Sequence, residues 1–447
     1  MTPAVGPGVA SPGADRSTDS YLPEHGNGGY RVLHYDLELD YRVASNRLEG
    51  KAVITARASQ ALSRFSLDLG RFRIQDVRVD GRPAKFGHRP NKLRIKPERP
   101  IGYGAIFKIE IRYAGSPTPI SGRWGDLGWD ELTDGALVAS QPNGSPSWFP
   151  CNDRPDDKAT FLVALTTASP YTAVVTGDLV ARRRRAGATT WVYERNEPTA
   201  PYLMSVQIGR YEQVEMPGNG VVQRAAVPPR LRGAFRHDFA RQGEIMASLE
   251  RLFGPYPFRE YVVVVTDDDL DDPVEAQGMA VFGRNHLDGR RTHERLVAHE
   301  LAHQWFGNSL TIADWRHIWL NEGFASYAEW LWSEVSGGPP AAAHAAQWHA
   351  WLKARPAGVT VADPGVNRMF DPLVYKRGAL TVHALRLRIG DRPFFSLLRS
   401  WTAEYRHRTV TTEQFRAHAG RYAAEPLDAL FTAWLDRPAL PPLPRAS

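Results

Sequence analysis

The 447-residue sequence predicts a multidomain α+β protein, in which an all-β, sandwich-like domain precedes an α-rich domain. Between residues 30 and about 211, apolar and polar side chains alternate in short segments bounded by turn residues, which is the period of half-buried strands. After a connector rich in proline and glycine, apolar residues recur at helical spacing instead. We therefore expect a disordered tail at residues 1–28, the β domain at residues 29–212 and the α-rich domain at residues 213–447.

The strands of the first domain follow one another without any helical period between them. The clearest alternation places Tyr35, Leu37 and Leu39 on one face and acidic residues on the other. Val79 is followed by Asp80-Gly81, a dipeptide typical of hairpin turns. Half-buried strands are expected at residues 35–41, 48–58, 77–79, 107–113, 161–166, 171–176 and 191–194.

The second domain begins with a helical pattern. Apolar residues from Phe235 to Phe253 predict one long amphipathic helix, which Gly254-Pro255 ends. The β-branched run Tyr261–Val265 predicts a short buried strand. From Thr292 onwards the chain is expected to be mostly helical.

Composition argues against several classes of protein. The formal charge of +6 does not indicate nucleic-acid binding, because the basic residues are mostly arginines spread along the chain. The one compact run, Arg182–Arg185, is expected in a solvated turn. No apolar run approaches the roughly 18–20 residues that cross a bilayer, and the N-terminus does not resemble a signal peptide. We expect a cytoplasmic protein without membrane contact, monomeric by default.

The segment that carries the chemistry is His299-Glu300-Leu301-Ala302-His303. Residues four apart on a helix lie one turn above each other, so His299 and His303 can direct two imidazoles at one metal ion. Glu300, about 100° further round the helix, lies beside that ion and can act as general base toward a water molecule. The competing interpretation is a pair of packing histidines, because so short a pattern also occurs by chance.

A third ligand strengthens the metal interpretation. Catalytic zinc sites usually have three protein ligands and an open fourth position. Eighteen residues separate His303 from Glu322, enough for the chain to turn and return on a second helix packed against the first. This predicts one Zn²⁺ ion held by His299, His303 and Glu322, although the same ligands also tolerate cobalt or manganese. Glu329 lies on the same helical face as Glu322. It could support a metal ligand or be a solvated carboxylate, and we favour the solvated carboxylate.

These segments resemble the gluzincin aminopeptidases, the family of aminopeptidase N. The resemblance includes His303-Gln304-Trp305-Phe306-Gly307-Asn308, Trp319-Leu320-Asn321-Glu322-Gly323 and, in the first domain, Phe149-Pro150-Cys151-Asn152-Asp153-Arg154-Pro155. It spans most of residues 30–440 and implies a thermolysin-like catalytic domain. The chain would be a short form without the C-terminal helical domain that roofs the active site in many relatives, which would leave a more open cleft.

The resemblance also implies roles for three further residues. Tyr375, in Val374-Tyr375-Lys376-Arg377-Gly378, matches a tyrosine that hydrogen-bonds the oxyanion of the tetrahedral intermediate. Glu275 matches the carboxylate of a Gly-Ala-Met-Glu-Asn segment that anchors the free α-amine of the substrate, although only the glutamate of that segment is retained. Gln141 matches a residue at the mouth of the first side-chain pocket and would contact the same amine.

The resemblance implies a zinc aminopeptidase that hydrolyses the N-terminal bond of peptides with a free N-terminus. Two alternatives stay open. The altered segment around Glu275 and the open cleft would also suit a zinc endopeptidase or oligopeptidase. The other alternative is a catalytically silent peptide-binding module with a metalloprotease fold.

Overall fold

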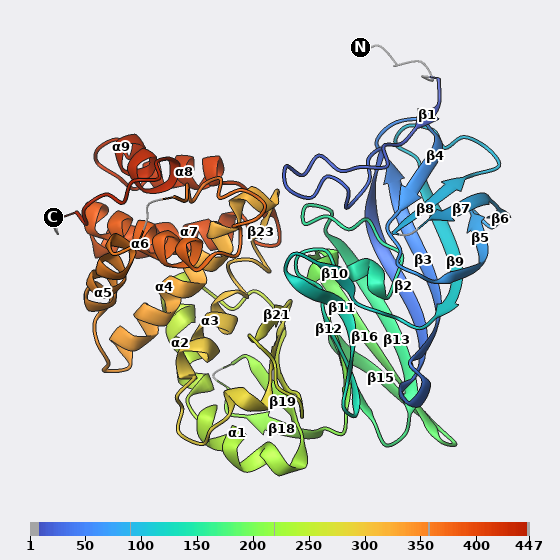
Figure 1. Ribbon diagram of the computed structural model, residues 1–447, viewed down its shortest axis with the longest axis horizontal. Helices are drawn as coiled ribbons and strands as arrows, with labels where there is room; N and C mark the ends of the chain where they lie inside the picture. The colour runs from blue at the N-terminus through green and yellow to red at the C-terminus, as the bar shows by residue number, and fades with distance from the viewer. Residues whose placement is uncertain (1–8, 90, 219, 356–357, 445–447) are drawn as a thin grey trace. The chain divides into compact units, whose positions relative to one another are not determined.

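The computed structural model describes residues 9–89, 91–218, 220–355 and 358–444. The chain divides into two compact units, Met1–Glu212 and Gln213–Ser447. The first unit is built of sheets, and the second is mainly helical with smaller sheets (Figure 1). This confirms the predicted fold class, a β-rich domain followed by an α-rich one. Among the described residues, none of the helices has the length and apolar character needed to span a membrane.

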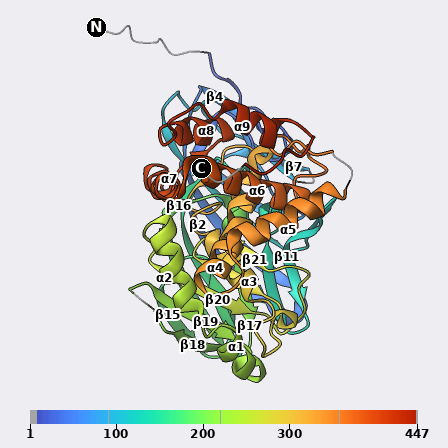
Figure 2. The same ribbon diagram turned by 90° about the vertical axis from the view of Figure 1, so that its left-hand side faces the viewer.

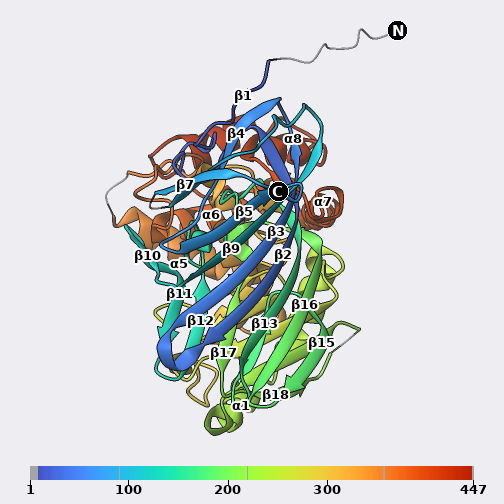
Figure 3. The same ribbon diagram turned by 90° about the vertical axis from the view of Figure 1, so that its right-hand side faces the viewer.

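The main sheet of the first unit has eight strands in the order β15-β16-β13-β2-β3-β9-β5-β6, and those from β15 to β5 lie side by side in Figure 3. Strand β2 pairs antiparallel with β3 and parallel with β13. The eight are β2 (Tyr30–Arg42), β3 (Arg47–Ala58), β5 (Arg73–Val79), β6 (Arg82–Pro83), β9 (Ile106–Gly115), β13 (Ala159–Ala168), β15 (Asp178–Arg185) and β16 (Ala188–Thr199).

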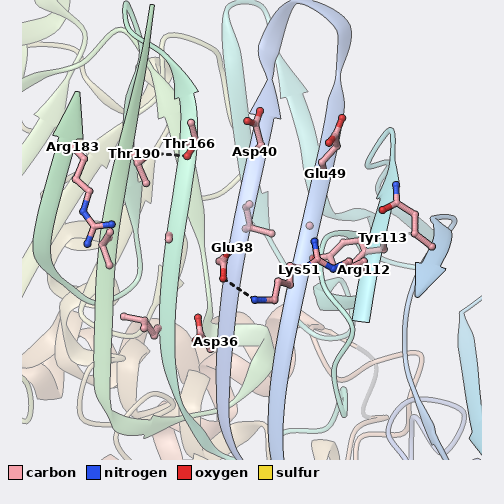
Figure 4. A pocket seen from close by; sticks show the side chains of 16 residues that line it. Asp36, Glu38, Asp40, Glu49, Lys51, Arg112, Tyr113, Thr166, Arg183 and Thr190 are labelled. Carbon is pink, nitrogen blue, oxygen red and sulfur yellow. Dashed lines mark hydrogen bonds and ion pairs between the residues drawn. The ribbon is translucent and has the colours of Figure 1, made fainter. Parts of the chain in front are cut away.

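The two faces of this sheet differ as the alternation predicts. On the inner face, the Tyr35 ring stacks on Phe161 with 4.7 Å between ring centroids. The outer face forms a shallow hollow of about 600 Å³, where Glu38 accepts a hydrogen bond from Lys51 and Thr166 bonds Thr190 (Figure 4). Period-two patterning therefore identified which side of the main sheet is buried.

Two further sheets complete the first unit and share its apolar core with the main sheet. One has the order β10-β11-β12-β17-β14, and the other has the order β1-β4-β8-β7. Their strands are β10 (Ile120–Gly122), β11 (Gly125–Leu132), β12 (Gly135–Ala139), β14 (Thr172–Val175) and β17 (Val206–Gly209), and β1 (Ser11–Pro12), β4 (Leu62–Leu67), β7 (Lys85–Arg89) and β8 (Lys92–Lys96).

The predicted disordered tail is wrong for residues 9–28, which we call the N-terminal segment; residues 1–8 lie outside the described residues. Strand β1 pairs parallel with β4. The buried carboxylate of Asp68 accepts hydrogen bonds from the backbone N–H of Gly26 at 2.9 Å, the side chain of Asn27 at 3.0 Å and the ammonium of Lys92. Polar composition suggested disorder, but these long-range hydrogen bonds hold the segment in place.

Two local predictions also differ from the structure. Residues Arg182–Arg185 belong to the edge strand β15 rather than to a turn, and they are exposed. The long helix predicted from Phe235 to Phe253 is two helices, α1 (Arg232–Asp238) and α2 (Gln242–Phe253). Ile245 lies six positions after Phe239, which on a helix is a rotation of about 240° beyond one full turn. The apolar stripes before and after this point were therefore out of phase.

The second unit combines a five-stranded sheet with the remaining helices, several of which are visible in Figure 2. The sheet has the order β18-β19-β20-β22-β21, and a two-stranded ladder joins β23 to β24. The strands are β18 (Glu212–Met216), β19 (Val222–Val227), β20 (Glu260–Val265), β21 (Val274–Ala276), β22 (Met279–Phe282), β23 (Thr311–Ile312) and β24 (Thr409–Val410). The helices are α3 (Glu294–Ala302), α4 (Trp319–Val335), α5 (Ala341–Lys353), α6 (Pro372–Ile389), α7 (Asp391–Glu404), α8 (Thr412–Gly420) and α9 (Asp428–Phe431).

Helices α4 and α6 touch backbone to backbone at two glycines. A Cβ atom added to Gly323 would lie 2.9 Å from backbone atoms of Gly378, and one added to Gly378 would lie equally close to Gly323. Side chains larger than hydrogen would therefore force the helices apart. Gly323 follows Glu322 directly, and Gly378 lies three residues after Tyr375. The crossing thus brings the helical turn of Glu322 next to the helical turn of Tyr375.

The hydrogen bonds at Asp68 give a stability prediction. Asp68→Ala should lower the free energy of unfolding by about 3–5 kcal/mol, because it leaves the largely buried Lys92 ammonium without its carboxylate. Asp76→Ala is the matched control, since the Asp76–Arg78 pair is exposed and should contribute little to stability. Urea unfolding of the whole chain measures both values. Equal, small losses would show that the N-terminal segment is not held by Asp68.

Candidate metal centre

Helices α3 and α4 bring three potential ligands together. His299 lies in the last turn of α3, His303 caps the end of that helix, and Glu322 lies in the first turn of α4. All three are buried, and one ligand atom from each lies within 4.8 Å of the others. An oxygen of Glu322 is 3.5 Å from Nε2 of His299 and 3.4 Å from Nε2 of His303. The two imidazoles and the carboxylate therefore converge on one point.

The hydrogen bonds of the two Nδ1 atoms determine the orientation of the imidazole rings. Nδ1 of His299 lies 2.8 Å from a carboxylate oxygen of Glu329, and Nδ1 of His303 lies 3.0 Å from the backbone carbonyl of Phe306. Since a carbonyl and a carboxylate accept hydrogen bonds, both Nδ1 atoms donate. The Nε2 lone pairs are then directed at the shared centre, as metal binding requires.

Glu329 is not the solvated carboxylate that we expected from the sequence. It is 8% exposed and contacts His299, Arg295 at 3.2 Å and Lys376 at 3.9 Å. Burial alone would raise its pKa, but the hydrogen bond to His299 and the two cations lower it to about 2. Two helical turns separate Glu329 from Glu322, so both face α3. That spacing was the signal available in the sequence.

The donor set fits a zinc ion. Two ligands about 2.0–2.1 Å from a tetrahedral zinc lie about 3.3 Å apart. The two Nε2–oxygen separations of 3.5 and 3.4 Å are close to that value, and longer than the roughly 2.7–2.9 Å of a direct charge-assisted hydrogen bond. Two nitrogens and one carboxylate oxygen are also a ligand set of catalytic zinc sites.

The carboxylates around the histidines favour positive charge at the centre. Burial opposes protonation of both rings. The nearby Glu322 carboxylate and the hydrogen bond to Glu329 outweigh burial and raise the pKa of His299 to about 9. The charges of Glu275 and Glu322 do the same for His303, whose pKa rises to about 10. Burial likewise opposes ionisation of Glu322, yet the two imidazoles lower its pKa to about 2. The pocket is thus suited to a cation.

Glu300 lies beside the ligands without joining them. It is 4% exposed, and within the described part of the chain its Oε2 atom has no hydrogen-bond partner. Burial, with a contribution from the nearby Glu275 and Glu322 carboxylates, raises its pKa to about 7 despite the opposing imidazoles. A buried carboxylate with such a pKa can both accept and release a proton near neutral pH.

Glu275 and Tyr375 also lie next to the candidate metal ligands, although they come from β21 and α6. Glu275, on β21, has a carboxylate oxygen within 4.8 Å of ligand atoms of Glu300 and His303. The Tyr375 ring, in the first turn of α6, stacks against His299 with 6.4 Å between centroids. Burial and the charges of Glu322 and Glu275 raise the Tyr375 pKa well above its usual value. Its phenol therefore stays protonated and able to donate.

Gln141 belongs to the other unit. It lies in the turn that follows β12, where a cis peptide bond joins it to Pro142. Its role in substrate binding stays a prediction.

Comparison with known proteins gives matches for both units. Residues 239–434 match the peptidase family M1 domain, and residues 31–203 match the peptidase M1 N-terminal domain. The fold resembles that of an M1 zinc metallopeptidase from Deinococcus radiodurans, with a TM-score of 0.88 and 30% sequence identity over 96% of this chain and 99% of that chain.

Curated aminopeptidases are also similar in sequence. Aminopeptidase M1-D of Oryza sativa subsp. japonica is 27% identical over 316 residues, and aminopeptidase B of Mus musculus is 25% identical over 389 residues. These alignments cover 66% and 80% of this chain. They cover only 36% of the rice protein and 58% of the mouse protein, so this chain corresponds to part of each relative.

The contact between Glu329 and His299 predicts an effect on metal affinity. Glu329→Gln should weaken zinc binding about 10–100-fold, because the amide lacks the negative charge that raises the basicity of the imidazole. Competition with a chromophoric chelator at constant pH measures the affinity. Glu334→Gln is the matched control, since Glu334 lies on the same helix and pairs with Arg386 at 3.0 Å. Equal affinities in the two variants would contradict a role for Glu329 at the metal.

Proposed function

Because the chain belongs to peptidase family M1, we propose that it is a zinc-dependent aminopeptidase that removes residues from the free N-terminus of peptides. The observation that carries the proposal is the presence of Glu275 and Glu300 beside the ligand triad His299, His303 and Glu322. The triad suits a hydrolytic metal site, and the extra carboxylate suits an amine. The similar Deinococcus protein supports the substrate class, since an alanine variant of it was crystallised with Tyr-Ser-Ala as substrate.

In the proposed mechanism, His299, His303 and Glu322 hold the zinc ion. Bound there, zinc supplies Lewis acidity toward a water molecule and the scissile carbonyl. Glu300 accepts a proton from the attacking water and passes a proton to the leaving amine. The Tyr375 phenol donates a hydrogen bond to the oxyanion that forms on the carbonyl oxygen.

Glu275 gives the reaction its exopeptidase character. Its carboxylate pairs with the α-ammonium group of the first residue, an interaction strengthened where water is partly excluded. Because Glu275 lies close to Glu300, an ammonium held there puts the first peptide bond within reach of the base. Gln141 is proposed as a second contact to the same ammonium.

The base is tested by Glu300→Gln. Turnover should fall by about 10²–10⁴-fold, because the amide cannot accept the proton of the attacking water. Zinc content, measured by atomic absorption after dialysis, should equal that of the wild type because Glu300 is not a ligand. Wild-type turnover in a zinc-loaded Glu300→Gln variant would remove Glu300 as the base.

The aminopeptidase activity is tested with paired substrates. The wild type should hydrolyse aminoacyl amides with a free amine and discriminate strongly against their N-acetylated forms. Glu275→Ala should lose most of that discrimination, mainly through a higher KM for the free amine, because the ammonium loses its counter-charge. Asp271→Ala, an exposed change in the preceding loop, is the control. If the wild type cleaves N-acetylated peptides as fast as free ones, the activity is that of an endopeptidase.

A further inference from the structure

The position of Glu275 is weakly determined by the sheet that carries it. Strand β21 contains three residues and lies at the edge of its sheet, where β22 is its neighbour. The residues before it, Asp271 and Asp272, are exposed. Edge strands this short gain little rigidity from pairing alone. A carboxylate that must lie a fixed distance from Glu300 needs a further attachment.

That attachment is the side chain of Gln304, which follows the metal ligand His303. Gln304 is fully buried. Its Oε1 atom accepts the N–H of Gly278 at 2.7 Å, and its Nε2 atom lies 3.2 Å from the carbonyl of Ala276 and 3.3 Å from that of Met279. One amide therefore contacts both ends of the turn between β21 and β22.

The same amide is joined to the helix that carries the base. Nε2 of Gln304 lies 3.4 Å from the backbone carbonyl of Glu300, one helical turn earlier. Asn308 adds a second support, because its Nδ2 atom donates to the carbonyl of Ala276 at 2.9 Å. The residue after Glu275 is thus held by two side chains from the segment that follows α3. An apolar residue at position 304 would remove the side-chain acceptor of the buried Gly278 N–H.

Resting on the proposed aminopeptidase function, we propose that Gln304 is a positioning residue that sets the place of Glu275 relative to Glu300. The distance between these two carboxylates determines whether a bound ammonium group leaves the first peptide bond at the base. Gln304 would therefore control the preference for free over blocked N-termini without touching the substrate itself.

The variant that tests the proposal is Gln304→Met, which keeps the volume and length of the side chain but removes its hydrogen bonds. The ratio of kcat/KM for a free aminoacyl amide to that for its N-acetylated form should fall about 10-fold, mainly through KM for the free amine. Zinc content should not change. Gln242→Met makes the same chemical change at another buried glutamine of this unit and should leave the ratio at the wild-type value.

A double-mutant cycle separates positioning from general damage. If Gln304 acts through Glu275, Gln304→Met should lower the ratio no further when Glu275→Ala is already present. Asn308→Ala removes only one of the supports and should give a smaller loss in the same direction. It also provides the test if Gln304→Met fails to fold. The proposal would be overturned if the effects of Gln304→Met and Glu275→Ala on the kcat/KM ratio multiplied independently. It would also be overturned if the ratio stayed unchanged in variants that are folded and zinc-loaded.

A binding measurement keeps this inference distinct from the proposed activity. In a Glu300→Gln background, calorimetry compares the affinities of the zinc-loaded protein for a dipeptide and its N-acetylated form. Preference for the free dipeptide that Gln304→Met abolishes supports the inference even if the wild type proves to be a poor catalyst. Absence of turnover in the wild type would refute the activity alone. Equal affinity of the parent for both dipeptides would refute the amine site and the role of Gln304 together.

Discussion

The close crossing of α4 and α6 at Gly323 and Gly378 is the constraint on which the second unit depends. With no side chain between the two backbones, Glu322 and Tyr375 lie on helical turns that touch. Helix α3 packs against α4, and its two histidines face Glu322 of that helix. A ligand, a hydrogen-bond donor and a base from three separate helices thus share one small volume. Helices hold such groups more rigidly than loops would.

The metal centre contains more carboxylates than imidazoles, and the contacts of each carboxylate determine how readily it ionises. Glu275, Glu300, Glu322 and Glu329 surround two imidazoles. Glu322 and Glu329 have low pKa values because they face histidines, whereas Glu300 has a raised one because burial and like charges dominate. Carboxylates of the same type therefore acquire different protonation behaviour from their positions alone, which allows ligands and a base to coexist.

Much of this could be predicted from sequence because it depends on local periodicity. The four-residue spacing of His299 and His303, and the alternation in β2, follow from backbone geometry. What could not be predicted depends on contacts between distant segments. The spacing of Glu329 from Glu322 shows that the two share a helical face, but it does not show that Arg295, Lys376 and His299 surround Glu329. The support of Glu275 by Gln304 also joins segments almost thirty residues apart. The split between α1 and α2, by contrast, was visible in the spacing of Phe239 and Ile245.

The N-terminal segment bears on how the first domain is delimited. The match to the M1 N-terminal domain begins at residue 31, but hydrogen bonds continue back through Asn27 and Gly26 to the strand pairing of Ser11. A recombinant protein cut at the start of the sequence match would expose β4 along one edge and leave Asp68 without two of its donors. The match to the family model thus begins inside the folding unit, which in this chain starts about twenty residues earlier.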